Sequence, residues 1–320
     1  MNPPGSEGPP ATQMAPRNAR ELLDRGRAFL ARQGLDESRL EAELLVAHAL
    51  GLERLRLFMD LDRPVTEREV ALARELLVRR SQREPVAYLT GQREFYGRRF
   101  EVGPGVLVPR PETELLVDRV RAFAKGRVFA AGGPAVLDIG TGSGCLAVTL
   151  ACELPGATVV AIDVSDAALA VAARNGTAHG AAVEWRKEDA LERLAAPGGV
   201  AAWEPGGPFD VVVSNPPYIA REMRAELPRD VAEHEPEIAL FAPRGAPDIW
   251  AQRLVIGVGP RLGAGGLLLV ELGFDQAPRL RVWLAEKGFD ASGKSPRGFT
   301  VRFGKDLAGI ERYLAIAAPE

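Results

Sequence analysis

Two short stretches of this 320-residue chain combine residue types and spacings that could do chemistry. The first reads Val136-Leu-Asp-Ile-Gly-Thr-Gly-Ser-Gly-Cys145, a strand-like run that enters a Gly-x-Gly-x-Gly turn and then a helix. Glycines let the backbone come close to a ligand, as such turns do where nucleotides bind in open α/β sheets. Because Asp138 precedes the turn, its carboxylate would repel a pyrophosphate but attract the ammonium group of a methionine-type ligand. The turn therefore favours S-adenosylmethionine over a dinucleotide.

Two further acids support the same ligand. Asp163 ends the next strand-like run, where a carboxylate can accept hydrogen bonds from both hydroxyls of a ribose. Asp189 follows the third run and could accept from the amino group of adenine. An α/β domain with small residues at its turns explains any one of these features, but it explains all three together poorly. The predicted cofactor-binding residues are Gly140, Thr141, Gly142, Ser143, Gly144, Asp163, Asp189 and Asn215.

The second stretch, from Phe209 to Tyr218, reads Phe-Asp-Val-Val-Val-Ser-Asn-Pro-Pro-Tyr, a buried strand that ends in a rigid turn. The two prolines have a fixed φ and no N–H, so the turn cannot continue into a helix or a sheet ladder. The Asn215 amide and the Pro216 carbonyl offer two acceptors that could hold a planar NH2 group and direct its nitrogen at a sulfonium methyl. Tyr218 could stack on that group. We predict Asn215, Pro216 and Tyr218 as catalytic, and these three with Pro217 as substrate-binding.

Two kinds of pattern surround these motifs. From about residue 18 to residue 89 the apolar residues recur with the helical period, and Ser38 with Glu41 and Thr66 with Glu69 have the spacing of capping boxes. After Pro134, strand-like and helix-like runs alternate, which is typical of a mostly parallel sheet with crossover helices. The predicted strands are Ala135–Ile139, Thr158–Asp163, Val183–Lys187, Val211–Ser214, Gly266–Glu271, Gly298–Phe303 and Arg312–Ala318. The last two are joined too closely for a helical crossover and are expected to be antiparallel.

These patterns divide the chain into four parts. Residues 1–16 are rich in Pro, Gly and Ser and are predicted to be a disordered tail, and residues 17–90 form a small all-helical bundle. Residues 91–110 have the aromatic and glycine content of a hairpin-like linker, and residues 111–320 form the α/β domain. Within this last part, Pro197–Pro208 is predicted to be a surface insertion, and Glu235–Phe241 to be either a lid over the site or a packing loop.

Composition excludes several classes of protein. The net charge of −3 provides no global positive field for nucleic acid, although a local basic groove stays possible. The cysteines Cys145 and Cys152 lie on one predicted helix and offer no disulfide framework, which suits a reducing cytoplasm. No apolar run is long enough to span a bilayer. None of the three histidines has a second ligand at metal-binding spacing, so no metal site is predicted.

From about residue 18 onward the chain resembles the release-factor glutamine methyltransferases, the HemK/PrmC family. The resemblance rests on Pro85-Val-Ala-Tyr-Leu-Thr-Gly91, Glu94-Phe-Tyr-Gly97, Val108-Pro-Arg-Pro-Glu-Thr-Glu-Leu-Leu-Val117, the glycine turn, Ser214-Asn-Pro-Pro-Tyr-Ile219, His234-Glu-Pro236 and Lys305-Asp-Leu-Ala-Gly309. It implies an α/β class I S-adenosylmethionine-dependent methyltransferase, a Rossmann-like, mostly parallel seven-stranded sheet with one antiparallel strand, preceded by the helical bundle. Ala190 departs from some relatives, which place an aromatic residue there beside adenine.

The resemblance also implies a substrate. The helical domain would bind a class I peptide chain release factor, and the enzyme would methylate the side-chain nitrogen (N5) of the glutamine in that factor's Gly-Gly-Gln motif. By the same resemblance we expect a cytoplasmic monomer that does not bind DNA directly.

Three other functions stay open at this point. An adenine-N6 nucleic-acid methyltransferase would share the Asn-Pro-Pro-Tyr motif, but the near-neutral charge argues against it. A methyltransferase acting on a ribosomal-protein glutamine would carry a segment resembling Ser-Pro-Ile-Gly after Pro109-Arg110, where this chain has Pro-Glu-Thr-Glu. A chaperone of release factors that binds the cofactor without turnover would not need the intact Asn-Pro-Pro-Tyr motif.

Overall fold

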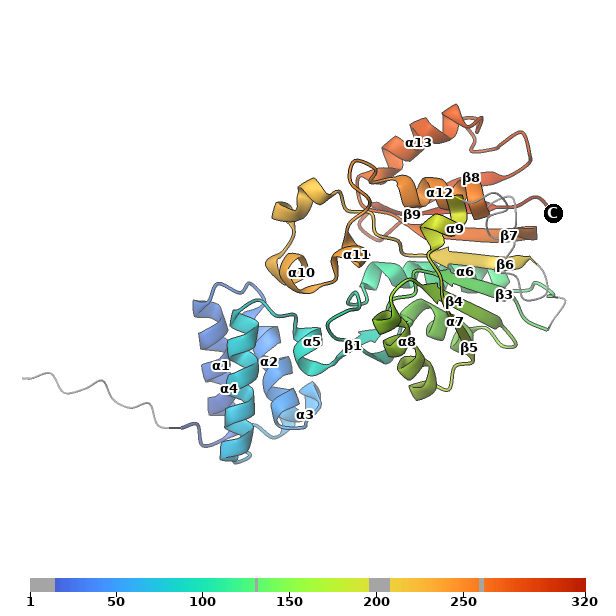
Figure 1. Ribbon diagram of the computed structural model, residues 1–320. Coiled ribbons are helices and arrows are strands. Elements are labelled where there is room, and N and C mark those ends of the chain that lie inside the picture. The colour runs from blue at the N-terminus through green and yellow to red at the C-terminus, as the bar shows by residue number, and fades with distance from the viewer. Residues whose placement is uncertain (1–14, 130–131, 196–207, 259–261) are drawn as a thin grey trace, which may run out of the picture. The chain divides into compact units, whose positions relative to one another are not determined.

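The computed structural model describes residues 15–129, 132–195, 208–258 and 262–320. The chain separates into two compact units, residues 1–90 and 91–320 (Figure 1). The predicted disordered tail, apart from its last two residues, and nearly all of the predicted insertion at 197–208 lie outside the described residues. Within the described part of the chain, no helix is both long and apolar enough to cross a bilayer.

The first unit is helical, as its periodicity predicts. Its apolar residues, among them Leu23, Leu30, Leu45 and Leu57, form one buried core. The first helix starts after Asn18, whose side chain accepts from the backbone N–H of Glu21, and it ends shortly before Gly34, which has a φ of +68°. The helices are α1 (Ala19–Arg32), α2 (Ser38–Ala49), α3 (Arg54–Met59), α4 (Glu67–Ser81) and α5 (Val86–Thr90).

One of the two predicted capping boxes is confirmed and the other is wrong. Thr66 and Glu69 exchange both hydrogen bonds of the box at the start of α4. At the start of α2 the N-cap is Glu37, Ser38 lies inside the helix, and there is no side-chain cap hydrogen bond. The reason is tertiary: Glu41 accepts two hydrogen bonds from Arg80, at 2.7 and 3.0 Å, so its carboxylate is not free to turn back to the helix start.

A second acid of α2 is also buried against arginines. Glu43 is 0% exposed and accepts from Arg27 at 2.6 Å, from Arg39 at 3.2 Å and from Arg54 at 2.8 Å. Burial alone would raise the pKa of Glu43, but the hydrogen bonds from the three guanidinium groups outweigh it and lower the pKa below its usual value. The bundle therefore compensates its buried negative charge with cations.

The second unit begins with the predicted hairpin. Strand β1 (Gln92–Phe95) pairs antiparallel with β2 (Arg98–Glu101). Phe95 and Phe100 are almost fully buried and join the core beneath one face of the large sheet. The segment at 91–110 contains the hairpin and is grouped with the second compact unit.

A mixed seven-stranded sheet forms the centre of this unit (Figure 1). Its order is β5-β4-β3-β6-β7-β9-β8, and the strands are β3 (Ala135–Ile139), β4 (Thr158–Asp163), β5 (Val183–Lys187), β6 (Phe209–Ser214), β7 (Leu262–Glu271), β8 (Thr300–Lys305) and β9 (Glu311–Ala317). All pairs are parallel except those of β9, which runs antiparallel to both β7 and β8. The predicted fold class, with its one antiparallel strand, is confirmed.

Helices cover both faces of the sheet. The helices and 3₁₀ segments are η1 (Pro111–Thr113), α6 (Glu114–Ala124), α7 (Cys145–Glu153), α8 (Asp166–Ala178), α9 (Ala190–Ala195), η3 (Arg221–Glu226), α10 (Arg229–His234), α11 (Glu237–Leu240), α12 (Ile249–Val258) and α13 (Gln276–Glu286). Alternation along β3 shows how they divide: Val136 packs with residues of α6 and α7, whereas Leu137 and Ile139 pack with residues of α9, α12 and α13. Both faces are therefore buried, as expected for a parallel sheet.

The order of the strands determines where a ligand can bind. Strands β3 and β6 are neighbours, and the chain leaves them toward opposite edges of the sheet, with β4 and β5 beyond β3 and with β7 beyond β6. In open α/β sheets a ligand binds outside the carboxyl ends of the strands at such a switch point. The glycine turn follows β3 and the Asn-Pro-Pro-Tyr motif follows β6, so the fold brings the two predicted motifs to the same place.

Candidate active site

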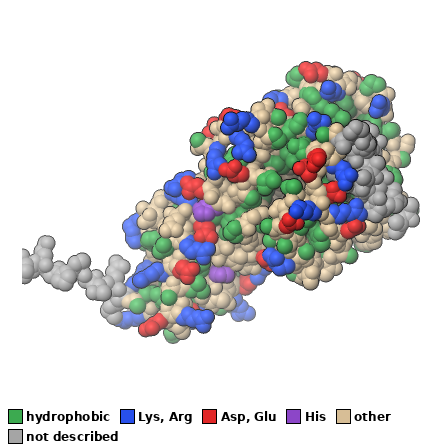
Figure 2. Space-filling view, viewed as in Figure 1, with side chains coloured by type: hydrophobic (Ala, Val, Ile, Leu, Met, Phe, Trp, Pro, Cys, Tyr) green, Lys and Arg blue, Asp and Glu red, His purple; other side chains and the backbone are tan. Residues whose placement is uncertain are grey.

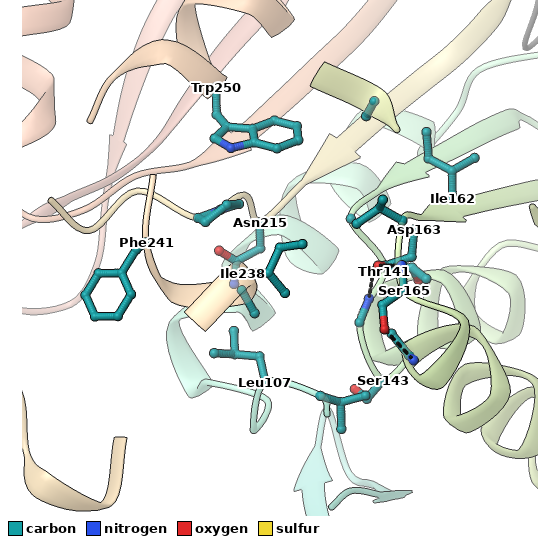
Figure 3. A pocket seen from close by; sticks show the side chains of 18 of the residues that line it. Leu107, Thr141, Ser143, Ile162, Asp163, Ser165, Asn215, Ile238, Phe241 and Trp250 are labelled. Atoms are coloured by element: carbon teal, nitrogen blue, oxygen red, sulfur yellow. Dashed lines mark hydrogen bonds between the residues drawn. The ribbon is translucent and has the colours of Figure 1, made fainter. Parts of the chain in front are cut away.

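A cavity of about 540 Å³ lies at the carboxyl ends of these strands (Figure 3). Asp163, Thr141, Ser143 and Ser165 lie on one side of it in the figure, and Asn215 lies toward Ile238 and Leu107. Of the predicted residues, those that line the cavity are Gly140, Thr141, Gly142, Ser143, Asp163, Asp189, Asn215 and Pro217. Gly144, Pro216 and Tyr218 are not among its lining residues.

The glycine turn lies against the neighbouring strand. The backbone N–H groups of Gly140 and Thr141 both donate to the carbonyl of Ile162 on β4. Gly140 and Gly142 have φ values of +76° and +56°, and a Cβ on either would meet no atom within 4 Å, so both leave open space. Gly144 serves packing instead, because a Cβ there would lie 3.0 Å from Ala172 and 3.1 Å from Trp185. Of the three glycines predicted to let a ligand approach the backbone, only Gly140 and Gly142 have open space beside them.

Of the two acids expected to bind ribose and adenine, Asp163 ends β4 and Asp189 follows β5. Asp163 accepts one hydrogen bond on each oxygen, from Gly142 N–H and from Ser165 N–H, both at 2.9 Å. A carboxylate oxygen has two lone pairs, so each can still accept a hydroxyl hydrogen. Asp189 is exposed and accepts from the backbone N–H of Glu192 at 3.0 Å, which leaves its other oxygen for a ligand.

Asp138 is a buried acid without a cation. It is 1% exposed, its Oδ2 accepts from the Thr141 hydroxyl at 2.7 Å, and its Oδ1 is buried without a hydrogen-bond partner in the described parts of the chain. Burial raises the pKa of Asp138 to about 7, although the Thr141 hydrogen bond opposes this. Asp138 does not line the cavity, but its hydrogen-bond partner Thr141 does, so a carboxylate here would favour a cationic ammonium group bound beside the turn. The residues present therefore fit S-adenosylmethionine.

Apolar side chains form another part of the cavity lining. Ile162, Val164, Ala190, Leu191 and Trp250 line it, and Trp250 comes from α12, which packs against α9. Ala190, the position that departs from some relatives, is buried and supplies only a methyl group. Trp250 presents an aromatic ring to the same cavity (Figure 3).

Asn215 is bound directly by Thr113 and, through Thr113, is connected to Glu271; neither residue was among the predicted site residues. Its amide Nδ2 donates to the Thr113 hydroxyl at 3.1 Å, and that hydroxyl donates to Glu271 Oε2 at 2.6 Å. Thr113 comes from the Pro-Glu-Thr-Glu segment at η1, and Glu271 is the last residue of β7. The signal for Glu271 was available, because it ends its strand as Asp163 ends β4. Both residues are 2% exposed.

Pro216 and Tyr218 each follow a lining residue in the chain, Asn215 and Pro217, but are not lining residues themselves. Pro216 is buried, and the ring of Tyr218 packs so closely on the loop after β7 that a Cβ on Gly273 would lie 3.0 Å from it. Burial, with the nearby Glu271 carboxylate, raises the pKa of the Tyr218 hydroxyl well above its usual value. Tyr218 is therefore neutral at physiological pH.

One buried carboxylate joins two segments of the cavity wall. Glu235 accepts from Val108 N–H at 3.0 Å and from the Arg110 guanidinium at 2.6 Å. It thereby ties the segment ahead of η1 to the segment that contributes Ile238 and Phe241 to the cavity. The stretch Glu235–Phe241, predicted as either a lid or a packing loop, forms part of this wall.

Relatives of known name match nearly the whole chain. The PrmC N-terminal domain model matches residues 21–91, and the Methyltransferase small domain model matches residues 113–231. The release factor glutamine methyltransferase of Chlorobaculum tepidum is 45% identical over 262 residues, which cover 82% of this chain and 87% of that protein. The protein of the same name from Geobacter sulfurreducens is 40% identical over 271 residues, covering 84% and 89%.

The chain belongs to the release factor glutamine methyltransferase family. The resemblance inferred from the motifs is thereby confirmed, and so is the enzyme class, a methyltransferase that uses S-adenosylmethionine. Among solved structures, the catalytic domain of hMettl16 in complex with a 3'UTR hairpin is similar, with a TM-score of 0.50 and 17% identity. That match covers 73% of this chain and 80% of that one, and it shows the fold alone.

Proposed function

We propose that this chain transfers the methyl group of S-adenosylmethionine to the side-chain nitrogen of a glutamine in a class I peptide chain release factor. One observation carries the proposal: the Asn215 amide lies in the same cavity as the glycine turn, and its nitrogen is engaged by Thr113. Its oxygen is therefore left as an acceptor for a planar NH2 group. The linker motif Pro-Glu-Thr-Glu, which supplies Thr113, distinguishes this family in the sequence and favours a protein glutamine.

In this proposal the cofactor half of the cavity binds by charge and by apolar contact. Asp163 would accept from the ribose hydroxyls and Asp189 from the adenine amino group, and the charge of the Asp138 carboxylate would favour the ammonium group. Gly140 and Gly142 leave space for the ligand beside the backbone. When bound, S-adenosylmethionine supplies a methyl carbon attached to a positively charged sulfur.

The substrate half would act mainly by positioning. The Asn215 amide oxygen and the Pro216 carbonyl would accept from the glutamine NH2 group, which directs the nitrogen toward the methyl carbon and stabilises the positive charge that develops on it. The neutral Tyr218, whose ring packs on the loop at Gly273, would support the turn rather than remove a proton. An amide nitrogen that gains a methyl group becomes acidic, so water suffices to take its proton and no strong general base is required.

The partner and the cellular setting are proposed together. The helical unit, residues 17–90, would bind the body of the release factor, and a substrate of this kind places the enzyme in the cytoplasm. We propose that it acts as a monomer without direct DNA binding. On the face shown in Figure 2, Lys and Arg side chains alternate with Asp and Glu side chains, and this is not the continuous basic surface that a nucleic-acid partner favours.

Mass spectrometry of a release factor tests the function directly. After incubation with the enzyme and S-adenosylmethionine, the peptide that contains Gly-Gly-Gln should gain one methyl group on the glutamine side chain. Asn215→Ala should lose this transfer while it still binds the release factor. Methyl groups found only in duplex DNA, under the same conditions, would replace the proposal with the adenine-N6 alternative.

A further inference from the structure

Glu271 is an acid close to the site that contacts neither the cavity nor, in the proposed function, either substrate. It is 2% exposed at the end of β7, and the Thr113 hydroxyl lies between it and the Asn215 amide. The three groups form a chain of hydrogen bonds from buried charge to cavity wall. The direction of each bond in such a chain depends on whether the acid at its end is ionised.

With Glu271 ionised, every bond has one possible direction. A carboxylate can only accept, so the Thr113 hydroxyl must donate to Glu271 Oε2. The hydroxyl oxygen is then left as an acceptor toward Asn215, and only the Nδ2 end of the amide can donate to it. The amide oxygen therefore points away from Thr113 and is available to a substrate.

With Glu271 protonated, the same chain can reverse. The carboxylic acid can donate to the Thr113 oxygen, which frees the hydroxyl hydrogen to donate to Asn215. The amide would then rotate so that its oxygen receives that hydrogen and its NH2 end faces the cavity. Two NH2 groups cannot hydrogen-bond to each other, so a glutamine could no longer be held in this way.

We propose that Glu271 and Thr113 are positioning residues, which fix the Asn215 side chain with its oxygen toward the substrate nitrogen as long as Glu271 carries its negative charge. This inference rests on the proposed function and deepens it, because it assigns the orientation of the Asn215 amide to a residue at the end of a different strand. Neither residue touches the reacting atoms.

The surroundings of Glu271 place the reversal in an accessible pH range. Burial raises its pKa to about 7, which the Thr113 hydrogen bond opposes. The charged and titratable groups that interact with it are Glu112, Arg110, Arg312, Tyr218 and Cys145. The two arginines are engaged elsewhere, Arg110 with Glu235 and Arg312 with Asp306, so neither neutralises Glu271 by direct pairing.

Kinetics of three variants test the positioning role. Thr113→Val removes the hydroxyl at nearly constant volume, and Glu271→Gln removes the charge; each should lower kcat for release-factor methylation by about 10- to 100-fold, the range expected when a hydrogen bond to a charged group is lost. Thr113→Ser keeps the hydroxyl and should restore most of kcat. The Kd for S-adenosylmethionine, measured by calorimetry, should stay within about twofold in all three variants.

Thr149 provides a matched control. It is a buried threonine of α7 whose hydroxyl has no hydrogen-bond partner in the described parts of the chain. Thr149→Val should leave kcat unchanged. If Thr113→Val has the kcat of the wild type, Thr113 has no positioning role. If the variant loses cofactor affinity in parallel with kcat, the role of Thr113 is structural instead.

A spectroscopic readout separates this inference from the proposed function, because it needs no substrate. The two side-chain N–H signals of Asn215, assigned by their loss in Asn215→Ala, should shift in a ¹H–¹⁵N spectrum with a midpoint near pH 7. Glu271→Gln should abolish that shift. Signals that do not move between pH 5 and pH 9 in the wild type overturn the reversal. If the enzyme shows the shift but transfers no methyl group to release factors, the hydrogen-bond chain from Glu271 to Asn215 is supported and the proposed function is refuted.

Discussion

The two units of the molecule differ in the partners of their buried carboxylates, although Glu235 of the catalytic unit is bound to an arginine, as the buried acids of the helical unit are. In the helical unit Glu43 is surrounded by three arginines and Glu41 is paired with Arg80, so each buried charge has a cation in contact with it. In the catalytic unit, Asp138 and Glu271 are just as buried, but each is hydrogen-bonded by a threonine hydroxyl and has no direct ion pair in the described parts of the chain. The first arrangement stabilises the fold. In the second, the carboxylate has no cation of its own and can interact with a ligand or with a neighbouring side chain.

This contrast gives the two units opposite responses to pH. The pKa of Glu43 is lowered by its arginines, so its contribution to stability is present above its unfolded value and is lost as the pH falls through the folded pKa. The pKa values of Asp138 and Glu271 are raised to about 7 by burial, so their contribution is fully present at low pH and is lost as the pH rises to about 7. Stability and readiness for catalysis therefore oppose each other in the catalytic unit.

The largest effect is expected where an ion pair of the helical unit is broken. Arg80→Met leaves Glu41 buried without its cation and should lower the free energy of unfolding of the helical unit by about 3–5 kcal/mol. Hydrogen-exchange protection of α2 and α4 in the full chain measures this. Arg74→Met, at an exposed position on α4, is the control and should cost less than about 0.5 kcal/mol. A small loss in Arg80→Met would mean that this buried pair does not stabilise the bundle.

The next largest expected effect is the change of stability with pH that the ionisation of Glu271 causes. Between pH 4 and pH 8 the ionisation of Glu271 should reduce the stability of the ligand-free catalytic unit by about 3 kcal/mol. Glu271→Gln should remove this part of the pH dependence, as measured by exchange protection of β7 at several pH values. If the variant and the wild type lose the same stability as the pH rises, Glu271 is not the buried titrating group.

A neutral substitution at Glu43 should change the stability of its unit in the opposite direction to a neutral substitution at Glu271. Glu43→Gln keeps the shape of the side chain but weakens its bonds to three guanidinium groups, and it should destabilise the helical unit by about 1.5–3 kcal/mol at pH 7. The difference from wild type should shrink as the pH falls below about 4. Equal destabilisation at all pH values would show that the charge of Glu43 is not what the arginines stabilise.

The smallest expected effect is on cofactor affinity, and it measures the part of binding that does not depend on the acidic residues of the site. Trp250→Leu removes an aromatic ring from the cavity lining and should raise the Kd for S-adenosylmethionine by about 2- to 10-fold, without changing the pH dependence of that Kd. Calorimetry measures this, and quenching of tryptophan fluorescence by the cofactor should weaken in the variant. Trp283→Leu on α13, outside the cavity lining, is the control and should leave both unchanged.

Local pattern was enough to predict most of the sheet. Strands β3, β4 and β5 have the predicted bounds, because each is a short run flanked by turn residues. Strand β7 starts at Leu262 instead of Gly266, since its glycine-rich first half carries no periodicity. The failed capping box at Ser38 illustrates the limit of local rules: Glu41 has the required spacing, but it binds an arginine 39 positions away.

Sequence reasoning predicted the site residues that belong to a single motif. It missed the residues that act through a contact between two distant segments. Asn215, Asp163 and Gly142 were predicted because each belongs to a motif that is complete within its own stretch, and all three line the cavity. The contact between Thr113 and Glu271 joins residues 158 positions apart, and only the sheet order and side-chain rotamers bring them together. Gly144 was placed against the ligand because spacing alone does not reveal that α8 and Trp185 occupy the space beside it.

The single carboxylate of Glu235 has a consequence for the order of events in a catalytic cycle. Because it binds Val108 and Arg110 with both oxygens, one wall of the cavity is assembled by contacts within the chain rather than by a ligand. A wall that is already ordered loses little conformational entropy when a guest arrives. Neither cofactor nor glutamine then needs to bind first to build this wall for the other, so this feature favours random-order binding kinetics.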